Sequence, residues 1–390
     1  MEPTYQDMLA IAHRAGLVTC VVAAGCLGDQ DDSAATAIVV GASDLVVLGA
    51  DSLLHDVRDL AVTDQGVWVL SAFEPHLYLF SRTGELKWTA GARGQGPREF
   101  GTPWSLVLPA PGDSAGIVVW DAGDRRLERF DAAGRHVGAW QLVTHYGPVL
   151  ADFEETYYGE PLRVRRLGDD VVLSSSAGQT SQTRSLWASE LTIFSRAESS
   201  PAPILSFSRF TEAAPETFPD VFAPVPLWAT CGSDELLVLD PLGSFLYRVT
   251  RYGVADSTAV TLPRAEVTDS DVRGWAEYAL TAEVRDEGLD PGAPEIAGVL
   301  EQFLRDTRAP ELATPVTLRC DAGGSPWVQA FSTDSDPRGY GRTWHRLDDP
   351  LLVSFPEGFQ PHVFTTDRVY GILTDALGVE RVAWVESTWE

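Results

Sequence analysis

A hairpin-like pattern that recurs after fifty residues places the strongest constraint on how this chain folds. Residues 66–84 hold a buried apolar run, an irregular segment, a second run ending at Phe80, and a glycine turn. Residues 117–134 repeat this order, so that Phe80 aligns with Phe130. Two runs of strand-forming residues joined by a turn predict an antiparallel hairpin. Recurrence at this period predicts stacked or radial supersecondary units.

Strand patterns of this kind form six units along the chain. The last unit has only three strands of its own, whereas Asp44–Leu48 reads as a lone strand without a hairpin partner nearby. We predict that Asp44–Leu48 pairs with the strand at 381–385 and closes a ring. A closed ring leaves only short, protected sheet edges. The units cover residues 57–90, 103–140, 162–194, 227–262, 316–355 and 362–385.

Residues 265–312 interrupt the strand pattern. Apolar residues three and four positions apart predict two amphipathic helices, the first capped by Asp269 or Ser270 and ended by Gly288. A structureless loop of this length is uncommon in a compact domain, so we expect the helices to pack on each other and on the sheets. The residues expected in these contacts are Trp275, Leu280, Val299, Leu300 and Phe303.

Three segments give the chain a resemblance to a known family. These are the connector Gly94–Phe100, the turn Phe130–Gly134 and the closing stretch Trp344–Phe359. With them the chain resembles six-bladed β-propellers of the NHL-related kind, which include bacterial lipoproteins of unassigned function. The resemblance implies an all-β fold over residues 44–390. It would be a six-bladed β-propeller closed by an N-terminal strand, with the helical hairpin (265–312) inserted between blades 4 and 5.

The N-terminal segment has the pattern of a targeting signal. Arg14 precedes an apolar run that is too short to span a bilayer and that ends in Ala-Ala-Gly-Cys at Cys26. This resembles the lipobox of bacterial lipoproteins, which implies a signal peptide at 1–25, lipidation of Cys26 and a flexible tether at 26–43. An uncleaved apolar helix is the alternative, and translation can start at Met1 or Met8.

Charge and lipidation together indicate location and partners. The formal net charge is −27, so a nucleic-acid backbone would be repelled and we expect no nucleic-acid partner. The resemblance to a lipobox implies attachment to a membrane through lipidated Cys26. Leu27 follows it where an inner-membrane lipoprotein carries Asp, which favours the outer membrane or a periplasm-facing site. An envelope protein or a small anionic or sugar-like molecule is then the expected ligand.

The sequence gives little support for catalysis or for a cofactor. There is no calcium loop, and the chain contains no Asn to fill the calcium site of propeller lactonases. We therefore expect no catalytic set, no metal site and no cofactor. A propeller that binds a ligand or a protein as a scaffold is the preferred function. The alternative is a propeller enzyme, a lyase or hydrolase, with its active site in the axial funnel.

A ligand site is expected where the inner strands of all blades converge on the axis. Arg, His and Trp side chains there would suit an anionic or sugar-like ligand. The alternative is that the arginines only pair with local carboxylates such as Asp56, Asp59 and Asp169. A slip of one residue would also turn any of these side chains away. The candidate residues are His55, Arg58, Trp104, Arg163, Arg165, Trp228, Arg319 and His362.

Two cysteines end the predicted inner strands of neighbouring units. Cys231 belongs to the fourth unit and Cys320 to the fifth. An oxidising envelope would permit a disulfide, which needs Cα atoms about 4.4–6.8 Å apart. Because equivalent positions in neighbouring blades are expected to be farther apart, we expect two buried free thiols.

Overall fold

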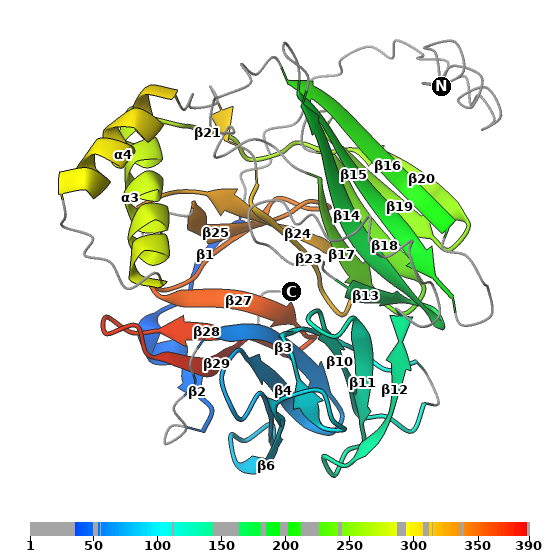
Figure 1. Ribbon diagram of the computed structural model, residues 1–390. Coiled ribbons are helices and arrows are strands. Elements are labelled where there is room, and N and C mark those ends of the chain that lie inside the picture. The colour runs from blue at the N-terminus through cyan, green and yellow to red at the C-terminus, as the bar shows by residue number, and fades with distance from the viewer. Residues whose placement is uncertain are drawn as a thin grey trace. The chain divides into compact units, whose positions relative to one another are not determined.

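The protein is a six-bladed β-propeller (Figure 1). Its blades are antiparallel sheets whose strands follow one another from the axis outward. The structure is a computed structural model. It describes residues 36–49, 54, 56–110, 113–142, 164–180, 185–195, 202–211, 226–240, 244–286, 294–306, 312–313, 315–334, 336 and 339–387.

The first three blades each have four strands. Blade 1 consists of β3 (Val57–Thr63), β4 (Gly66–Ser71), β5 (Leu77–Phe80) and β6 (Leu86–Ala90). Blade 2 consists of β9 (Pro103–Val107), β10 (Ile117–Asp121), β11 (Arg126–Phe130) and β12 (His136–Gln141). Blade 3 consists of β13 (Val164–Leu167), β14 (Asp170–Thr180), β15 (Ser185–Phe194) and β16 (Ala202–Thr211).

The last three blades complete the ring. Blade 4 consists of β17 (Leu227–Cys231), β18 (Glu235–Asp240), β19 (Phe245–Thr250) and β20 (Gly253–Ala259). Blade 5 contains β23 (Thr317–Cys320), β24 (Pro326–Phe331), β25 (Tyr340–Arg346) and β26 (Leu351–Ser354). Blade 6 contains β27 (Phe359–Phe364), β28 (Arg368–Thr374) and β29 (Glu380–Glu386).

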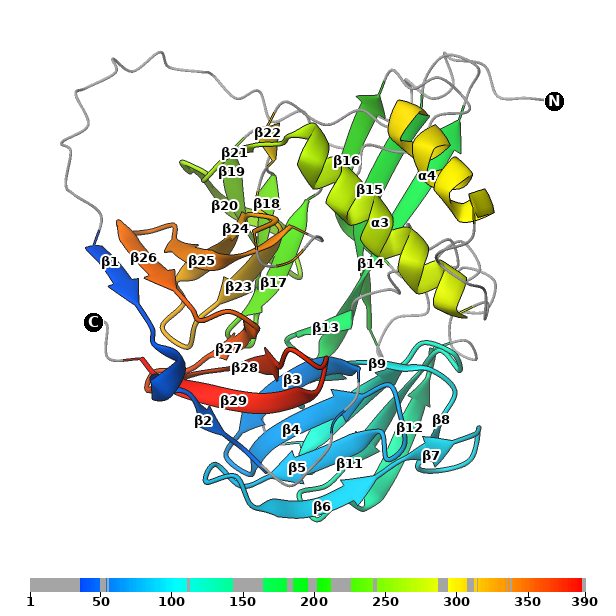
Figure 2. The same ribbon diagram turned by 90° about the vertical axis from the view of Figure 1, so that its left-hand side faces the viewer.

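The inner strands β3, β9, β13, β17, β23 and β27 surround the axis (Figure 2). Because each blade has four alternating strands, every inner strand starts at the same face of the ring. We call this the connector face, since the links between blades also lie there, and the opposite one the turn face. The link from blade 1 to blade 2 lies at the connector face and contains the short parallel strands β7 (Ala92–Arg93) and β8 (Glu99–Phe100).

Segments N-terminal to β3 add one strand to each of two blades. In β2 (Val46–Val47), Val46 pairs antiparallel with Trp384 of β29, the strand to which the sequence assigned this segment. A further strand, β1 (Thr36–Val39), pairs parallel with β26 at the edge of blade 5. Residues 36–43 were expected in the tether, and the difference arises because the β-branched run in 36–39 suits an edge strand.

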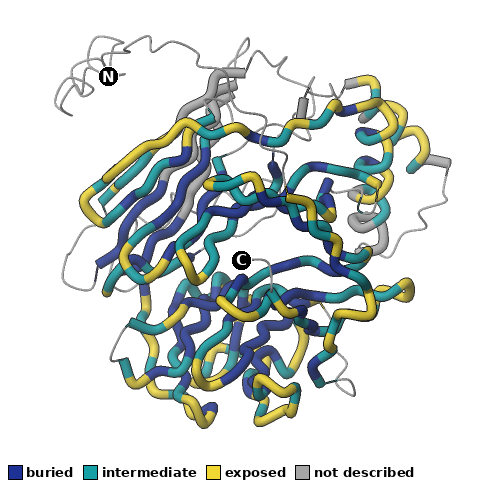
Figure 3. Tube along the Cα trace, turned by 180° about the vertical axis from the view of Figure 1, so that it is seen from behind, coloured by how far each residue is buried: buried dark blue, intermediate teal, exposed yellow. Residues whose placement is uncertain are grey.

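The apolar cores lie between neighbouring blades, and many residues of the blade strands are buried (Figure 3). Phe80 is fully buried and packs with Tyr370 and Ile372 between blades 6 and 1. Phe130, the equivalent residue one repeat later, is also fully buried and packs with Trp68 between blades 1 and 2. The repeat seen in the sequence is therefore a repeat of the seams between blades.

The interruption of the strand pattern is a helical pair between blades 4 and 5. Its base is closed by β21 (Ala265–Glu266) and β22 (Leu312–Ala313), which pair antiparallel. Between them lie α3 (Asp269–Asp286) and α4 (Pro294–Asp306). The N-cap of α3 is Thr268, not Asp269 or Ser270. The Thr268 hydroxyl accepts a hydrogen bond of 3.3 Å from the N–H of Asp271. In return, the Asp271 carboxylate accepts a hydrogen bond of 2.7 Å from the N–H of Thr268. In the part of the chain that the structure describes, no helix combines the length and apolarity needed to cross a membrane.

Only part of the expected helix packing is found. Trp275 and Leu304 pack in a cluster with buried Phe331 of β24, so the helices lie against blade 5. Arg273 and Glu301 join the two helices through an ion pair of 3.3 Å. Val299 was expected in these contacts but is 48% exposed, because it lies on the outer side of α4. Leu280 and Leu300 are partly buried, and the side chain of Phe303 lies outside the described residues.

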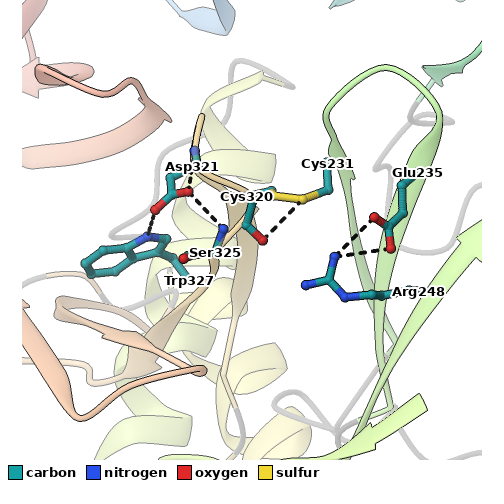
Figure 4. The surroundings of a disulfide bond; sticks show 9 residues. Cys231, Glu235, Arg248, Cys320, Asp321, Ser325 and Trp327 are labelled. Atoms are coloured by element: carbon teal, nitrogen blue, oxygen red, sulfur yellow. Dashed lines mark hydrogen bonds and ion pairs between the residues drawn. A yellow bond between two sulfur atoms is a disulfide. The ribbon is translucent and has the colours of Figure 1, made fainter. Parts of the chain in front are cut away.

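The two cysteines form a disulfide (Figure 4). The Cα atoms of Cys231 and Cys320 are 5.3 Å apart, which is within the range that a disulfide requires. The expectation of free thiols was wrong because β17 and β23 pack directly against each other at their ends near the axis. The bond joins blades 4 and 5, the two blades between which the helical pair is inserted.

Candidate functional site

A regular inner strand presents its edge, not a face, to the axis. Its side chains alternate between the two neighbouring blades. In β17, Leu227 and Ala229 pack in the cluster with blade 5, whereas Trp228 packs with Leu167 in the cluster with blade 3. Trp228, expected at the axis, is therefore a core residue between blades 3 and 4 and is only 9% exposed.

Three of the predicted residues escape this alternation because they lie on β-bulges. Arg58 in β3 and Trp104 in β9 are the extra residues where the pairing with the next strand shifts. His362 has the same role in β27. The described pairings of β13, β17 and β23 with their neighbours show no such shift. A bulge bends the strand and re-aims a side chain, and bulges are common beside functional sites.

The bulges of blades 1 and 2 bring their extra residues into contact. The guanidinium carbon of Arg58 lies over the Trp104 ring, 4.2 Å from its centroid. Nη2 of Arg58 also donates a hydrogen bond of 2.6 Å to Oδ2 of Asp56. The Arg58 side chain stays 28% exposed and that of Asp56 45% exposed. A solvent-accessible cation thus rests on an aromatic ring at the connector face.

A second arginine reaches this region from blade 3. Nη1 of Arg165 lies 3.4 Å from Oδ2 of Asp59, on the inner strand of blade 1. The same carboxylate oxygen accepts a hydrogen bond of 2.9 Å from the N–H of Leu106 in blade 2. Since Asp59 and Arg165 belong to alternate blades, their contact passes on the axial side of the strand between them. Polar groups from three blades therefore meet at the axis.

Both arginines pair with local carboxylates and stay partly exposed. Arg58 pairs with Asp56 and Arg165 pairs with Asp59, as the alternative of local pairing predicted. Neither pair is buried, because each arginine side chain keeps more than a fifth of its surface exposed. Ion pairs with this exposure are weak, so their carboxylates can be exchanged for those of a ligand.

A buried polar network fixes the position of Trp104. Arg126 donates to the carbonyls of Gln95 and Glu99 at 2.8 and 2.7 Å, which holds the link between blades 1 and 2. The carboxylate of Asp121 accepts hydrogen bonds from the N–H groups of Gly101 and Thr102, the two residues before β9. The strand that carries Trp104 therefore starts from a fixed point.

The remaining groups of this network surround Arg126. Glu128 and Asp124 lie 2.9 and 3.2 Å from its guanidinium, and His136 contacts the second oxygen of Glu128. Burial raises the pKa of Glu128, although Arg126 and His136 oppose the shift. Burial and the neighbouring Asp121 also raise the pKa of Asp124. Every member contacts another member or the link, so the network has a structural role. Within the described residues, no three His, Cys, Asp or Glu side chains are arranged to hold a metal ion.

Two further predicted residues lie on the inner strands of blades 5 and 6. Arg319 lies next to Cys320 at the turn-face end of β23 and donates to the carbonyl of Leu318 at 3.1 Å. His362 lies on β27 in blade 6 and is partly buried. His55, Arg163 and Cys26 lie outside the described residues, so their predicted roles stay predictions.

From the sequence, Asp56 and Asp59 were expected only as neutralising partners of the arginines. Asp56 has a φ of +48°, a left-handed conformation that few residues other than glycine adopt. Asp59 satisfies the backbone of another blade. An Asp on each side of an inner-strand Arg was a signal that could have singled out this stretch.

Comparisons with known proteins show only solved structures that resemble the fold of this chain. No protein-family model matches the chain, and no curated protein matches it. Among solved structures, the chain is similar to virginiamycin B lyase from Staphylococcus aureus, with 11% identity and a TM-score of 0.42 over 87% of this chain and 98% of that one. It is also similar to a Bacteroides fragilis protein described as a putative exported protein, with 10% identity and a TM-score of 0.44 over 91% of this chain and 100% of that one. A third similar structure is the PQQ-bound aldose sugar dehydrogenase of Streptomyces coelicolor, with 14% identity and a TM-score of 0.41 over 88% of this chain and 97% of that one. At these identities and TM-scores the similarities carry no argument about activity.

Proposed function

We propose that this protein is a cell-envelope lipoprotein whose propeller binds a small anionic ligand, or an acidic group of an envelope partner, at the connector face. The observation that carries the proposal is the contact between Arg58 and Trp104 on the bulges of consecutive blades. Arg165 adds a second, partly exposed guanidinium at the axis.

The chemistry of the site favours an anion. A guanidinium on an aromatic face keeps N–H groups for a carboxylate or phosphate in its own plane. The chain as a whole carries a formal charge of −27, so an anion is repelled by most of the protein. Exposed guanidinium groups at the axis offer such a ligand local attraction. No specific observation favours the alternative of a lyase or hydrolase at the axis.

The envelope location is supported by two independent features. The segment before Cys26 resembles a lipobox, and the disulfide between Cys231 and Cys320 suits an oxidising compartment outside the cytoplasm. Changing Cys26 to Ser should abolish lipidation and leave the protein soluble or unprocessed. Unchanged mass and membrane partitioning in Cys26→Ser would refute the lipid anchor.

Ligand binding is tested by thermal stabilisation of a chain without residues 1–26. The probes are benzoate, glucuronate and inorganic phosphate, each with the parent and with Arg58→Ala. A ligand at a hundred times its Kd stabilises the folded state by about 2.7 kcal/mol. We expect one or more probes to stabilise the parent and to lose most of this effect in Arg58→Ala. Arg135→Ala, which removes the same charge from the turn face, is the matched control.

A further inference from the structure

Asp56 holds a carboxylate against Arg58 in a way that resembles a bound ligand. We infer that Asp56 is an internal competitor, and that the ligand of this site carries a carboxylate which displaces it from Arg58. This inference rests on the proposed function and adds the chemical class of the ligand and the residue that limits its affinity.

The backbone of Asp56 is fixed in an unfavourable conformation. Its φ of +48° lies in the left-handed region, which costs free energy for a residue other than glycine. Two contacts hold it there. The Asp56 carbonyl accepts a hydrogen bond of 3.0 Å from the N–H of Ala72, and the next N–H, that of Val57, donates to Glu380 of blade 6 at 2.6 Å. The surrounding strands thus present this carboxylate to Arg58.

The contact that Asp56 makes with Arg58 is incomplete. Only Nη2 of Arg58 donates to Asp56, by a single hydrogen bond. Nε of the same guanidinium is buried and has no hydrogen-bond partner among the described residues. A buried donor without an acceptor is unfavourable. A carboxylate that approaches in the guanidinium plane can accept from Nε and Nη2 together, which Asp56 does not do here.

Asp56 and a ligand would compete for one edge of the guanidinium. Since Asp56 already accepts from Nη2, a ligand carboxylate that binds Nε and Nη2 together takes the place of its half-exposed side chain. The ligand then exchanges one hydrogen bond for two and keeps the contact with Trp104. The release of Asp56 into solvent limits its affinity, since two carboxylates beside one guanidinium repel each other.

The test is Asp56→Asn, because Asn tolerates a left-handed conformation and removes only the charge. With benzoate and glucuronate as probes, titration calorimetry should show binding about five- to tenfold tighter for Asp56→Asn than for the parent, and strongly weakened binding for Arg58→Ala. Arg58→Lys, which keeps the charge but cannot bind a carboxylate side-on, should lose the gain when combined with Asp56→Asn. Glu235→Gln, which removes an arginine-paired carboxylate in blade 4, is the control and should leave affinity unchanged.

The outcomes separate the two claims. If Arg58→Ala abolishes binding but Asp56→Asn binds no tighter than the parent, Asp56 is no competitor and the binding site stands. If phosphate gains as much from Asp56→Asn as the carboxylates do, the ligand class is wrong. If neither the parent nor Asp56→Asn binds any probe, or if Arg58→Ala binds as the parent does, the proposed function fails together with this inference.

Discussion

The guanidinium carbon of Arg58 lies 4.2 Å from the ring centroid of Trp104, and the two residues occupy the same place in consecutive blades. When the repeats are aligned on Phe80 and Phe130, the bulge of β3 and the bulge of β9 fall at one position. The repeat thus provides the same backbone irregularity twice and places a different side chain on each. Because neighbouring inner strands pack together, two re-aimed side chains become one contact.

Deleting the closing strand should destabilise the whole propeller. Leu48, which follows β2, is buried among residues of blades 1 and 6, so removal of residues 44–48 exposes both an edge of β29 and this seam. We expect a cooperative loss of several degrees in Tm. Deleting residues 36–39 is the matched comparison and should cost less, because β1 only extends blade 5 and its Val39 is 81% exposed. Equal Tm values for the parent and the 44–48 deletion would show that the ring closes without β2.

Removing the disulfide should destabilise the protein by about 2–4 kcal/mol, since the bond closes a long loop in the unfolded chain. Cys231 and Cys320 are 89 residues apart in sequence and join blades 4 and 5. In a protein of this size, we expect Cys231→Ala/Cys320→Ala to lower Tm by roughly 3–6 °C. A dithiol reductant should lower the Tm of the parent to the same value and leave the variant unchanged. A reductant effect of equal size in both proteins would contradict this assignment.

The fold could be predicted from the sequence because the residues that repeat are buried core residues. Phe80 and Phe130 occupy equivalent seams, and a buried aromatic at a fixed period identifies a blade whatever the surface residues are. The extra strand β1 was missed because an edge strand buries little, so its residues carry no strong pattern. The disulfide was missed because the distance between the two cysteines depends on how closely two inner strands pack. That packing distance cannot be predicted from a local sequence pattern.

The candidate site could be predicted only in part. The residue types at the inner strands were recognised, but Trp228 lies in a regular strand and Arg58 and Trp104 lie on bulges. A bulge is set by pairing between two strands, and one residue more or less reverses the direction of a side chain. The ion pair between Arg165 and Asp59 spans alternate blades, so it depends on the ring and not on neighbouring residues.

The turn after Phe130 should make stability depend on pH in the acidic range. The backbone N–H of Arg135 and its guanidinium donate to the Asp131 carboxylate, and these bonds hold the pKa of Asp131 below its ordinary value. The ionised form is therefore favoured in the fold. Its contribution is fully present above the ordinary pKa and is lost as pH falls through the lowered one.

We expect Asp131→Asn to lower Tm at pH 7 and the difference from the parent to shrink once the pH falls below the ordinary Asp pKa of about 3.8. Ser81 occupies the equivalent position in blade 1, where its hydroxyl accepts a hydrogen bond from the N–H of Glu85 at 3.0 Å. Ser81→Ala is the matched comparison, because it removes a similar bond without a titratable group. A difference between Asp131→Asn and the parent that stays constant from pH 7 to pH 3 would contradict the prediction.

Two substitutions in the helical pair should differ sharply although both produce alanine in a helix. Trp275 packs in the cluster with Val272 and Phe331, so Trp275→Ala leaves a cavity between α3 and blade 5 and should cost about 2–3 kcal/mol. Val299 is 48% exposed, so Val299→Ala should change stability by less than about 0.5 kcal/mol. Amide hydrogen exchange of residues 265–312 measures both, because the helices can open without unfolding of the blades. Faster exchange in α3 and α4 of Trp275→Ala, with parent-like exchange in Val299→Ala, is the expected result. If the parent already exchanged rapidly throughout this segment, the packing of the helical pair on blade 5 would be refuted.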